Sequence, residues 1–152
     1  MDELDRKILS RLQRDSRIPI AELAEEVGAS RTVCWRRIKA LEETGVIRGQ
    51  VALLDRGKLN LPVTVFVAIK TSRHEADWLQ KFAAVVEQFP EITEFYRMSG
   101  DVDYLLKVVV PDVAAYDRFY QRLIRRIDLS DVSSNFAMEE IKFTTALPLQ
   151  NM

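Results

Sequence analysis

The sequence has one cysteine, Cys34, and one histidine, His74. A single cysteine excludes an internal disulfide framework, and neither residue has the companions that a Cys/His metal site requires. The longest apolar runs, such as residues 65–69, are far too short to cross a bilayer. Acidic residues follow Met1 at once, in place of the basic and then apolar residues of a signal segment. We therefore expect a cytoplasmic protein with no membrane partner, metal or other cofactor.

The sequence also has almost no net charge, because 22 Lys and Arg residues oppose 23 Asp and Glu residues. With 47% hydrophobic and 30% charged residues, the composition is that of a soluble globular protein. The balance hides an asymmetry. Residues 1–60 carry 12 basic and 10 acidic residues, whereas residues 61–152 carry 10 and 13. Five basic and only two acidic residues lie between Arg31 and Arg48, so we expect an anionic partner to bind there.

Apolar periodicity predicts three short helices in the first half of the chain. The first covers residues 2–14 with Asp2 as its cap, the second begins at Pro19 and ends at Gly28, and the third follows the capping Ser30. Two helices joined by a short glycine-containing turn are typical of the helix-turn-helix motif, whose second helix enters the major groove of DNA.

The third helix carries the cationic surface. Its apolar stripe of Cys34, Ile38 and Leu41 is expected to face inward, with Cys34 a buried hydrophobe rather than a redox sensor. Arg37 lies at the margin of this stripe and either contacts DNA or braces the helix packing. The side chains that we expect at the DNA, besides Ser30 and Arg37, are Arg36, Thr32 and Trp35 at bases or groove walls and Lys39, Arg31 and Arg48 at phosphates. The alternatives are a solvated helix whose charges only aid solubility, and a Trp35 that packs on the scaffold.

From residue 62 on, the expected elements follow the order βαββαβ. We predict strands over residues 62–71, 91–98 and 102–110, a last strand or strand pair over 132–145, and helices over 74–89 and from the capping Asp112 to about Arg126. This is the ferredoxin-like arrangement, in which both helices cover one face of an antiparallel sheet. A second subunit is the simplest cover for the other face.

The expected fold class is therefore α+β, with two domains. Residues 1–54 form a winged helix-turn-helix domain whose wing is a pair of short strands over 46–54, residues 55–61 form a polar linker, and residues 62–152 form a ferredoxin-like effector-binding and oligomerisation domain. His74, at the expected start of a helix, is predicted to be solvated rather than a ligand.

Four stretches, in this order, resemble the Lrp/AsnC (feast/famine) transcriptional regulators of bacteria and archaea. They are LDRKILSRLQRDSRIPIAELAEEVGAS (4–30), CWRRIKALEETGVIRGQVALLD (34–55), SGDVDYLLKVVVPDVAAYDRF (99–119) and MEEIKFTTALPL (138–149). The resemblance implies a winged helix-turn-helix joined to a ferredoxin-like effector module. It also implies homodimers that often assemble into octamers, binding to promoter DNA, and a response to an amino acid.

Two positions depart from the family pattern. The family often has proline at the start of the recognition helix, where this chain has Arg31 and Thr32, so the operator sequence cannot be carried over. The family usually has a Leu-Gly pair after the wing, where this chain has Leu59 and Asn60. The second change is mild, because Asn tolerates a positive φ better than most residues.

The SGDVD stretch at residues 99–103 has a structural interpretation and a functional one. By its own chemistry it is a hairpin turn in which Gly supplies an unusual dihedral and Asp bonds back to the chain. The resemblance places this loop beside an effector pocket between dimers. It implies effector binding by Ser99, Gly100, Asp101 and Asp103, and by Asn135, Phe136 and Ala137 at the start of the last strand. Carboxylates can hold an ammonium group and free N–H groups a carboxylate, as an amino acid requires, unless the pocket is empty or serves assembly alone.

Three functions from different classes fit these features. The leading one is a sequence-specific, promoter-binding transcriptional regulator modulated by an amino acid or related small molecule. The second is a nucleoid-type architectural protein that wraps DNA with little specificity. The third is a tetrapyrrole decarboxylase of similar architecture, which would use His and Arg side chains of its second domain. The single histidine argues against the third, so we expect no catalytic residues and no enzyme.

Overall fold

The computed structural model describes residues 1–72 and 76–151, and the chain divides into two compact units. The first unit comprises Met1–Leu53 together with Ile141–Met152, and the second comprises Leu54–Glu140. Both ends of the chain therefore belong to the first unit. Within the described ranges, none of the helices combines the length and the apolar character needed to cross a membrane.

The first unit contains three helices where the sequence predicts them: α1 (Glu3–Leu12), α2 (Ile20–Val27) and α3 (Arg31–Glu43). Side chains cap two of them. The Asp2 carboxylate accepts the Asp5 backbone N–H while the Asp5 carboxylate accepts that of Asp2, both at 3.0 Å. Ser30 Oγ accepts the Val33 N–H at 3.2 Å. Caps of this kind stabilise a helix by about 1 kcal/mol each, so local sequence determines these helix starts.

The helix ends of the turn also follow local rules. Gly28 terminates α2 with a φ of 71°, in the left-handed region that favours glycine. The sequence predicts that α2 begins at Pro19. The helix instead begins at Ile20, and Pro19 is its N-cap. The result is the short connection between α2 and α3 that a helix-turn-helix requires.

The core of the first unit is small. Among the described residues it consists of seven buried hydrophobic side chains: Ile8, Ile18, Leu23, Ala24, Val27, Cys34 and Leu41. Cys34 has no solvent-exposed surface, and burial raises the pKa of its thiol, which keeps it protonated. Cys34 is therefore the small buried hydrophobe expected from its place in the apolar stripe.

The segment expected to form the wing contains no strand. Residues 46–54 follow α3 without regular structure, and Val51 and Leu53 are 80% and 65% exposed. The predicted pair of short strands is therefore wrong for this chain. Two short strands without a third element beside them are marginal in water, and although Ile47 packs against the core, Val51, Leu53 and Leu54 stay exposed.

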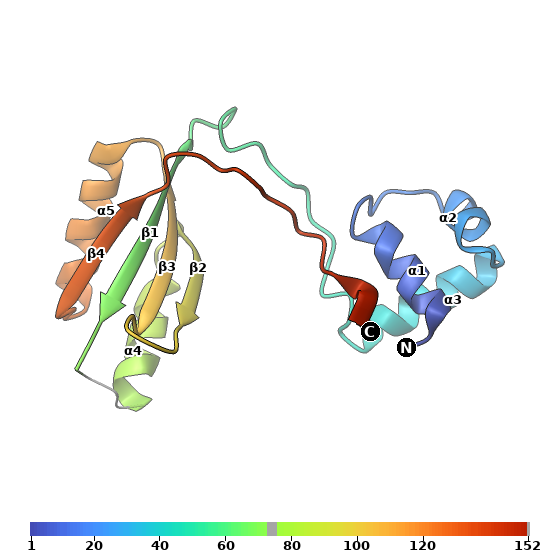
Figure 1. Cartoon of the computed structure of the whole chain (residues 1–152), viewed down its shortest axis with the longest axis horizontal. Coiled ribbons are helices and arrows are strands. Elements are labelled where there is room, and N and C mark those ends of the chain that lie inside the picture. The colour runs from blue at the N-terminus through green and yellow to red at the C-terminus, as the bar shows by residue number, and fades with distance from the viewer. Residues whose placement is uncertain (73–75, 152) are drawn as a thin grey trace. The chain divides into compact units, whose positions relative to one another are not determined.

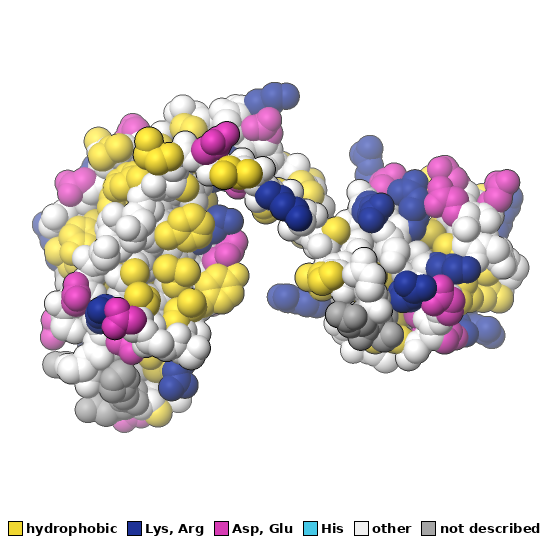
Figure 2. All heavy atoms as spheres, viewed as in Figure 1, with side chains coloured by type: hydrophobic (Ala, Val, Ile, Leu, Met, Phe, Trp, Pro, Cys, Tyr) yellow, Lys and Arg dark blue, Asp and Glu magenta, His cyan; other side chains and the backbone are white. Residues whose placement is uncertain are grey.

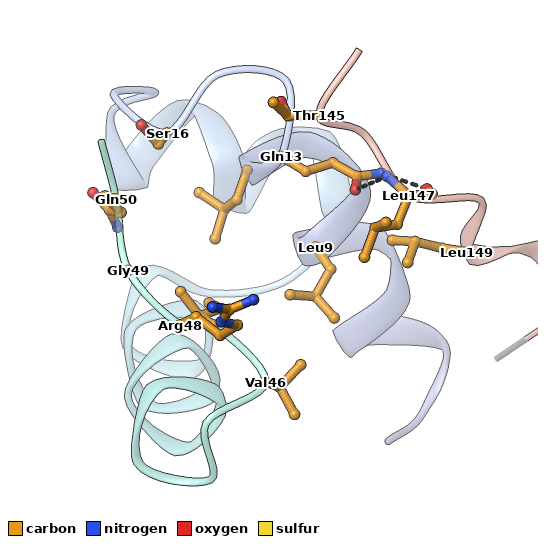
Figure 3. A pocket seen from close by; sticks show the side chains of 12 residues that line it. Leu9, Gln13, Ser16, Val46, Arg48, Gly49, Gln50, Thr145, Leu147 and Leu149 are labelled. Atoms are coloured by element: carbon orange, nitrogen blue, oxygen red, sulfur yellow. Dashed lines mark hydrogen bonds between the residues drawn. The ribbon is translucent and has the colours of Figure 1, made fainter. Parts of the chain in front are cut away.

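The described residues from 141 on belong to the first unit as a C-terminal tail, which ends in a short 3-10 helix at Leu149–Asn151. The side-chain amide of Gln13, next to the end of α1, makes two hydrogen bonds with the backbone of a single tail residue, Leu147. Leu147 N–H donates to Gln13 Oε1 at 2.8 Å, and Gln13 Nε2 donates to Leu147 O at 3.1 Å (Figure 3). The sequence-based division placed residues 62–152 in one domain and did not anticipate this packing.

The second unit is built from β1 (Val63–Lys70), α4 (Ala76–Val86), β2 (Ile92–Arg97), β3 (Tyr104–Val110), α5 (Val113–Arg126) and β4 (Asp131–Phe136). The strands form one antiparallel sheet in the order β2-β3-β1-β4, with both helices on one face (Figure 1). This confirms the βαββαβ prediction. The last strand ends at Phe136 rather than continuing to residue 145, because the residues after it leave β1 and lead into the tail.

The sheet and the helices enclose a large core. Alternating residues of β1, such as Val65 and Val67, point to the helices and are fully buried. Phe82 of α4 is also fully buried. The centroid of its ring lies 4.9 Å from that of Phe95 and 5.5 Å from that of Tyr104. Among the described residues, sixteen buried side chains belong to this cluster. An aromatic interior of this size holds α4 and α5 firmly on one face of the sheet.

The opposite face of the sheet has no layer over it in the second unit. Phe66, whose position in β1 points it away from the helices, is 38% exposed, and Tyr96 of β2 is 50% exposed. Hydrophobic side chains gather over this part of the molecule in the space-filling view (Figure 2). Before β1, Asn60 adopts a φ of 57°, in the left-handed region that Asn tolerates better than most residues.

Candidate nucleic-acid interface and effector loop

The predicted DNA-contacting side chains of α3 share one outward face. Arg31, Thr32, Arg36 and Lys39 are exposed, and Trp35 is 58% exposed. The inward face carries the buried side chains of Cys34 and Leu41, and Ile38 packs against the same cluster. The helix thus separates its apolar and cationic faces as the 100° periodicity predicted.

Trp35 and Lys39 are neighbours on this face. The Lys39 Nζ lies 5.8 Å from the centroid of the Trp35 ring, one helical turn away. A cation held over an indole face orients both groups, by an interaction of about 0.5–1 kcal/mol at an exposed site. With Trp35 more than half exposed, its ring projects from the helix rather than into the scaffold.

Arg37 points elsewhere. Its guanidinium forms ion pairs with Asp2 at 2.8 Å and with Asp5 at 3.2 Å, and Asp5 is only 5% exposed. The backbone N–H of Asp5, and then the Arg37 guanidinium, lower the pKa of the Asp2 carboxyl. These contacts attach α3 to the start of α1, which is the bracing alternative that the sequence left open for Arg37.

Arg48 is exposed but lies after α3, in the segment that faces the tail. It lines a cavity of about 530 Å³ together with α1, residues 46–50 and tail residues such as Leu147 and Leu149 (Figure 3). Leu9 and Leu12 form the α1 side of this cavity. Arg48 is the only charged side chain in that lining within the described residues. Because α3 ends at Glu43, Arg48 is not part of the outward face of that helix.

The 99–103 loop is a hairpin turn, as its structural interpretation predicted. Gly100 has a φ of 111°, a conformation that residues with a Cβ rarely adopt. The Met98 N–H donates to Asp103 O at 2.8 Å, and the Asp103 carboxylate accepts the Thr71 N–H at 2.7 Å. Asp103 therefore fastens the loop to the end of β1. Ser99 is exposed beside it.

Asp101 is the carboxylate that the loop presents to solvent. Its side chain is 94% exposed and pairs with Lys70 Nζ at 3.0 Å. The hydrogen bond from Lys70 to Asp101 raises the pKa of the Lys70 ammonium. Sequence reasoning missed Lys70, because the bond that brings it to the loop depends on the β1–β3 register. An exposed ammonium and carboxylate side by side offer partners for both charges of a zwitterion.

Asn135, Phe136 and Ala137 lie at the other end of the sheet. They are at the end of β4 rather than at its start, because the strand stops at Phe136. Phe136 pairs with Val65, near the beginning of β1, whereas the loop adjoins Ile69 and Lys70 at the end of that strand. Asn135 and Ala137 bond to the backbone of Phe66 and Thr64. The seven predicted effector residues therefore do not meet within one chain.

No group of three or more His, Cys, Asp or Glu side chains in the described part of the chain is arranged to hold a metal ion. His74, for which a solvated position is expected, lies outside the described residues.

Comparison with known proteins identifies both units. Residues 1–48 match the family described as winged helix-turn-helix DNA-binding, and residues 64–147 match the Lrp/AsnC ligand binding domain. The chain belongs to the Lrp/AsnC family. It is thus a DNA-binding transcriptional regulator with a separate ligand-binding module, as the resemblance implied.

Lrp/AsnC proteins similar to this chain are found among curated sequences and solved structures. The glutamate uptake regulatory protein of Zymomonas mobilis is 50% identical over 149 residues, covering 98% of this chain and 91% of that protein. An AsnC family transcriptional regulator from Agrobacterium tumefaciens superposes with a TM-score of 0.97 at 63% identity, over 100% of this chain and 99% of that one. A Neisseria meningitidis regulator in complex with L-Met gives 0.93 at 36% identity, over 99% and 98%.

Proposed function

We propose that this Lrp/AsnC regulator recognises an operator in promoter DNA through the outward face of α3, and that an amino acid bound at the 99–103 loop tunes this recognition. The observation that carries the proposal is the exposed surface of Trp35, Arg36 and Lys39 opposite the buried side of the same helix. A helix presented in this way can place its side chains in a major groove. The protein would act in the cytoplasm, where promoter DNA lies.

Each side chain of this interface has a proposed role. Arg36 and Thr32 read base edges, and Trp35 packs against the groove wall or a thymine methyl. Arg31, Lys39 and, from its separate position, Arg48 attract phosphates. Ser30 holds the first turn of α3 in place through its cap, and Arg37 sets the angle of the helix through Asp2 and Asp5.

Two observations support an amino acid as the effector. One relative has a structure in complex with L-Met, and another is named for the regulation of glutamate uptake. In this chain Asp101 and Lys70 form an exposed pair that a zwitterion can engage at both of its charges. Gly100 supplies the turn that presents Asp101, and Asp103 positions it.

A complete effector site would need more than one subunit. Asn135, Phe136 and Ala137 are far along the sheet from the loop in a single chain, so they join Asp101 only if another protomer supplies them. The uncovered sheet face, with Phe66 and Tyr96 exposed, is the surface that a homodimer would bury. Dimers assembled into an octamer would then bring loops of different dimers together.

The experiment is a fluorescence-anisotropy titration with the DNA upstream of the protein's own coding sequence and with a scrambled duplex. We expect the Arg36→Ala, Lys39→Ala double variant to lose at least tenfold in operator affinity, since a well-placed Arg contact alone contributes about 1–3 kcal/mol. Lys7→Ala, Arg14→Ala is the matched control, because it removes two exposed charges from the same unit but away from α3. Equal affinities of the native protein for both duplexes would favour an architectural protein instead.

A second arm of the titration adds single amino acids. We expect one of them to shift the native curve and the Asp101→Ala variant to bind operator normally without responding. Asp77→Ala, an exposed carboxylate on α4 of the same unit, should respond like the native protein. A full response from Asp101→Ala would exclude the loop as the effector site while leaving operator recognition intact.

A further inference from the structure

Helix α5 of the second unit carries an arginine stripe that neither operator recognition nor effector binding uses. The stripe consists of Arg118, Arg122, Arg125 and Arg126, at spacings of four, three and one residues. All four side chains are exposed, whereas Phe119 and Leu123 on the inner side of α5 are fully buried. Residues three and four apart share a helix face, so the four guanidinium groups form one cationic surface.

The stripe is concentrated against an acidic background. Residues 54–140 carry 11 Lys and Arg and 14 Asp and Glu, yet α5 carries four arginines and only one acidic residue, Asp117. Arg122 pairs with Glu91, and Arg126 donates to the Gln88 side chain. Arg118 and Arg125 have no side-chain partner in the described part of the chain, so at least two positive charges on this face are not neutralised within the protein.

A hollow lies at the C-terminal end of the stripe. It has a volume of about 230 Å³ and is lined by Gln88, Phe89, Arg122, Arg125 and Arg126. The guanidinium carbon of Arg122 lies 5.4 Å from the centroid of the Phe89 ring, and that ring packs edge-on against Phe119 in the core. The buried aromatic pair thus fixes the orientation of Arg122. Three guanidinium groups and an amide around one hollow suit a phosphate group, which arginine binds in bidentate fashion.

Structural roles explain only part of this arrangement. Arg125 and Arg126 lie in the last turn of α5, where positive charges interact favourably with the helix dipole. Glu91 accounts for the position of Arg122. Neither argument applies to Arg118, which lies two turns before the end of the helix and has no partner among the described residues.

We propose that the α5 arginine stripe is a second DNA contact, which binds backbone phosphates without reading sequence. The inference rests on the proposed function, because DNA must first be held at α3. From Arg118 to Arg126 the helix advances about 12 Å, a distance along which one DNA strand carries three to four phosphates at roughly 3.4 Å each. The partner that fits is therefore a stretch of duplex outside the operator, bound by charge alone.

The test compares two lengths of DNA that share one operator. The short duplex has about 25 base pairs, enough for two half-sites one helical turn apart, and the long duplex extends it to about 200 base pairs of the natural upstream sequence, beyond one persistence length. The variant is Arg118→Gln, Arg125→Gln, which removes two charges without breaking a contact in the described chain. Lys81→Gln, Arg97→Gln removes two exposed charges elsewhere on the same unit and serves as its control.

We expect the stripe variant to bind the short duplex like the native protein and the long duplex on the order of tenfold more weakly at moderate salt. The slope of log affinity against log salt on long DNA should fall by about one per lost phosphate contact. The control variant should match the native protein on both duplexes. An unchanged long-duplex affinity of the stripe variant would overturn the inference, as would an equal loss in the control. Failure of the native protein to bind the short duplex would instead contradict the proposed function, and the second contact with it.

Discussion

The two units of this regulator are held together by different kinds of interaction. In the described residues of the first unit, seven buried hydrophobic side chains are supplemented by a reciprocal cap at Asp2 and Asp5, an Arg37 ion pair and a side-chain clamp from Gln13. In those of the second unit, sixteen buried side chains, several of them aromatic, form the interior, and ion pairs such as Glu94 with Lys107 lie around it. A surface that reads DNA must keep its charges outside, and a small unit then depends on polar contacts to fix its helices.

Because of this difference, we expect different changes of conditions to affect the stability of the two units. The second unit has charged contacts as well, such as Glu94 with Lys107 and Arg122 with Glu91, but its helices are held on the sheet mainly by buried apolar side chains. The helix angles of the first unit depend on charged partners at the start of α1. The sensor thus has the larger apolar interior, whereas the contact between α1 and α3 of the DNA reader includes ion pairs.

Among the substitutions that test this comparison of the two units, Phe82→Ala should have the largest effect on stability. Truncation of a fully buried aromatic side chain should destabilise the second unit by about 3–5 kcal/mol, through lost contacts and a residual cavity. Trp78 belongs to this core and Trp35 to the first unit, so urea unfolding followed in a Trp35→Phe background reports the second unit alone. Leu23→Ala is the counterpart in the first unit. If Phe82→Ala and Leu23→Ala shift this transition equally, the units do not unfold separately.

A smaller effect is expected from Arg37→Ala. Asp5 would be left 5% exposed without its cation, and we expect the first unit to lose about 1–3 kcal/mol. Arg36→Ala, the neighbouring arginine on the exposed face, should leave the unfolding midpoint unchanged while weakening DNA binding. The opposite result, a stable Arg37→Ala protein that no longer binds DNA, would assign Arg37 to the groove and not to the scaffold.

The smallest expected effect is a loss of thermal stability at acid pH. Because the folded-state pKa of Asp2 is lowered below its ordinary value of 3.8, its contribution to stability is present above that pH and is lost as the pH falls through the folded pKa. Melting curves of native and Asp2→Asn proteins should therefore converge between about pH 5 and pH 2. Glu94, whose pKa is lowered by the Lys107 hydrogen bond, allows the same comparison in the second unit through Glu94→Gln. A constant difference in Tm at all pH values would show that Asp2 acts through shape and not charge.

Local signals made most of the fold predictable from sequence. The caps at Asp2, Ser30 and Asp112 and the left-handed Gly28 depend on residues at most three positions away, so the sequence states them directly. The outward face of α3 follows from the same short-range periodicity. The sequence could not decide whether Arg37 contacts DNA or braces the helices. That depends on its partners Asp2 and Asp5, which only the packing of α1 on α3 brings to it.

Long-range contacts were beyond the sequence. Residues 46–54 have a strand-like pattern, but a strand exists only when another strand accepts its hydrogen bonds. The pairing of Gln13 with Leu147 spans 134 residues and leaves no periodic trace. The distance of Asn135 from the effector loop depended on where β4 ends, and the boundaries of elements are the least certain part of any sequence-based prediction.

The Gln13–Leu147 clamp also bears on the order in which the protein is made. The first unit needs residues from both ends of the chain, so α1 to α3 emerge from the ribosome well before the tail that packs on them. At ordinary rates of synthesis the interval from residue 53 to residue 147 lasts about 5–20 seconds. During that time the sensor is being synthesised, while α1 to α3 lack the tail that completes their unit. In a newly synthesised regulator the DNA-binding unit, although its helices are made first, would therefore be completed last.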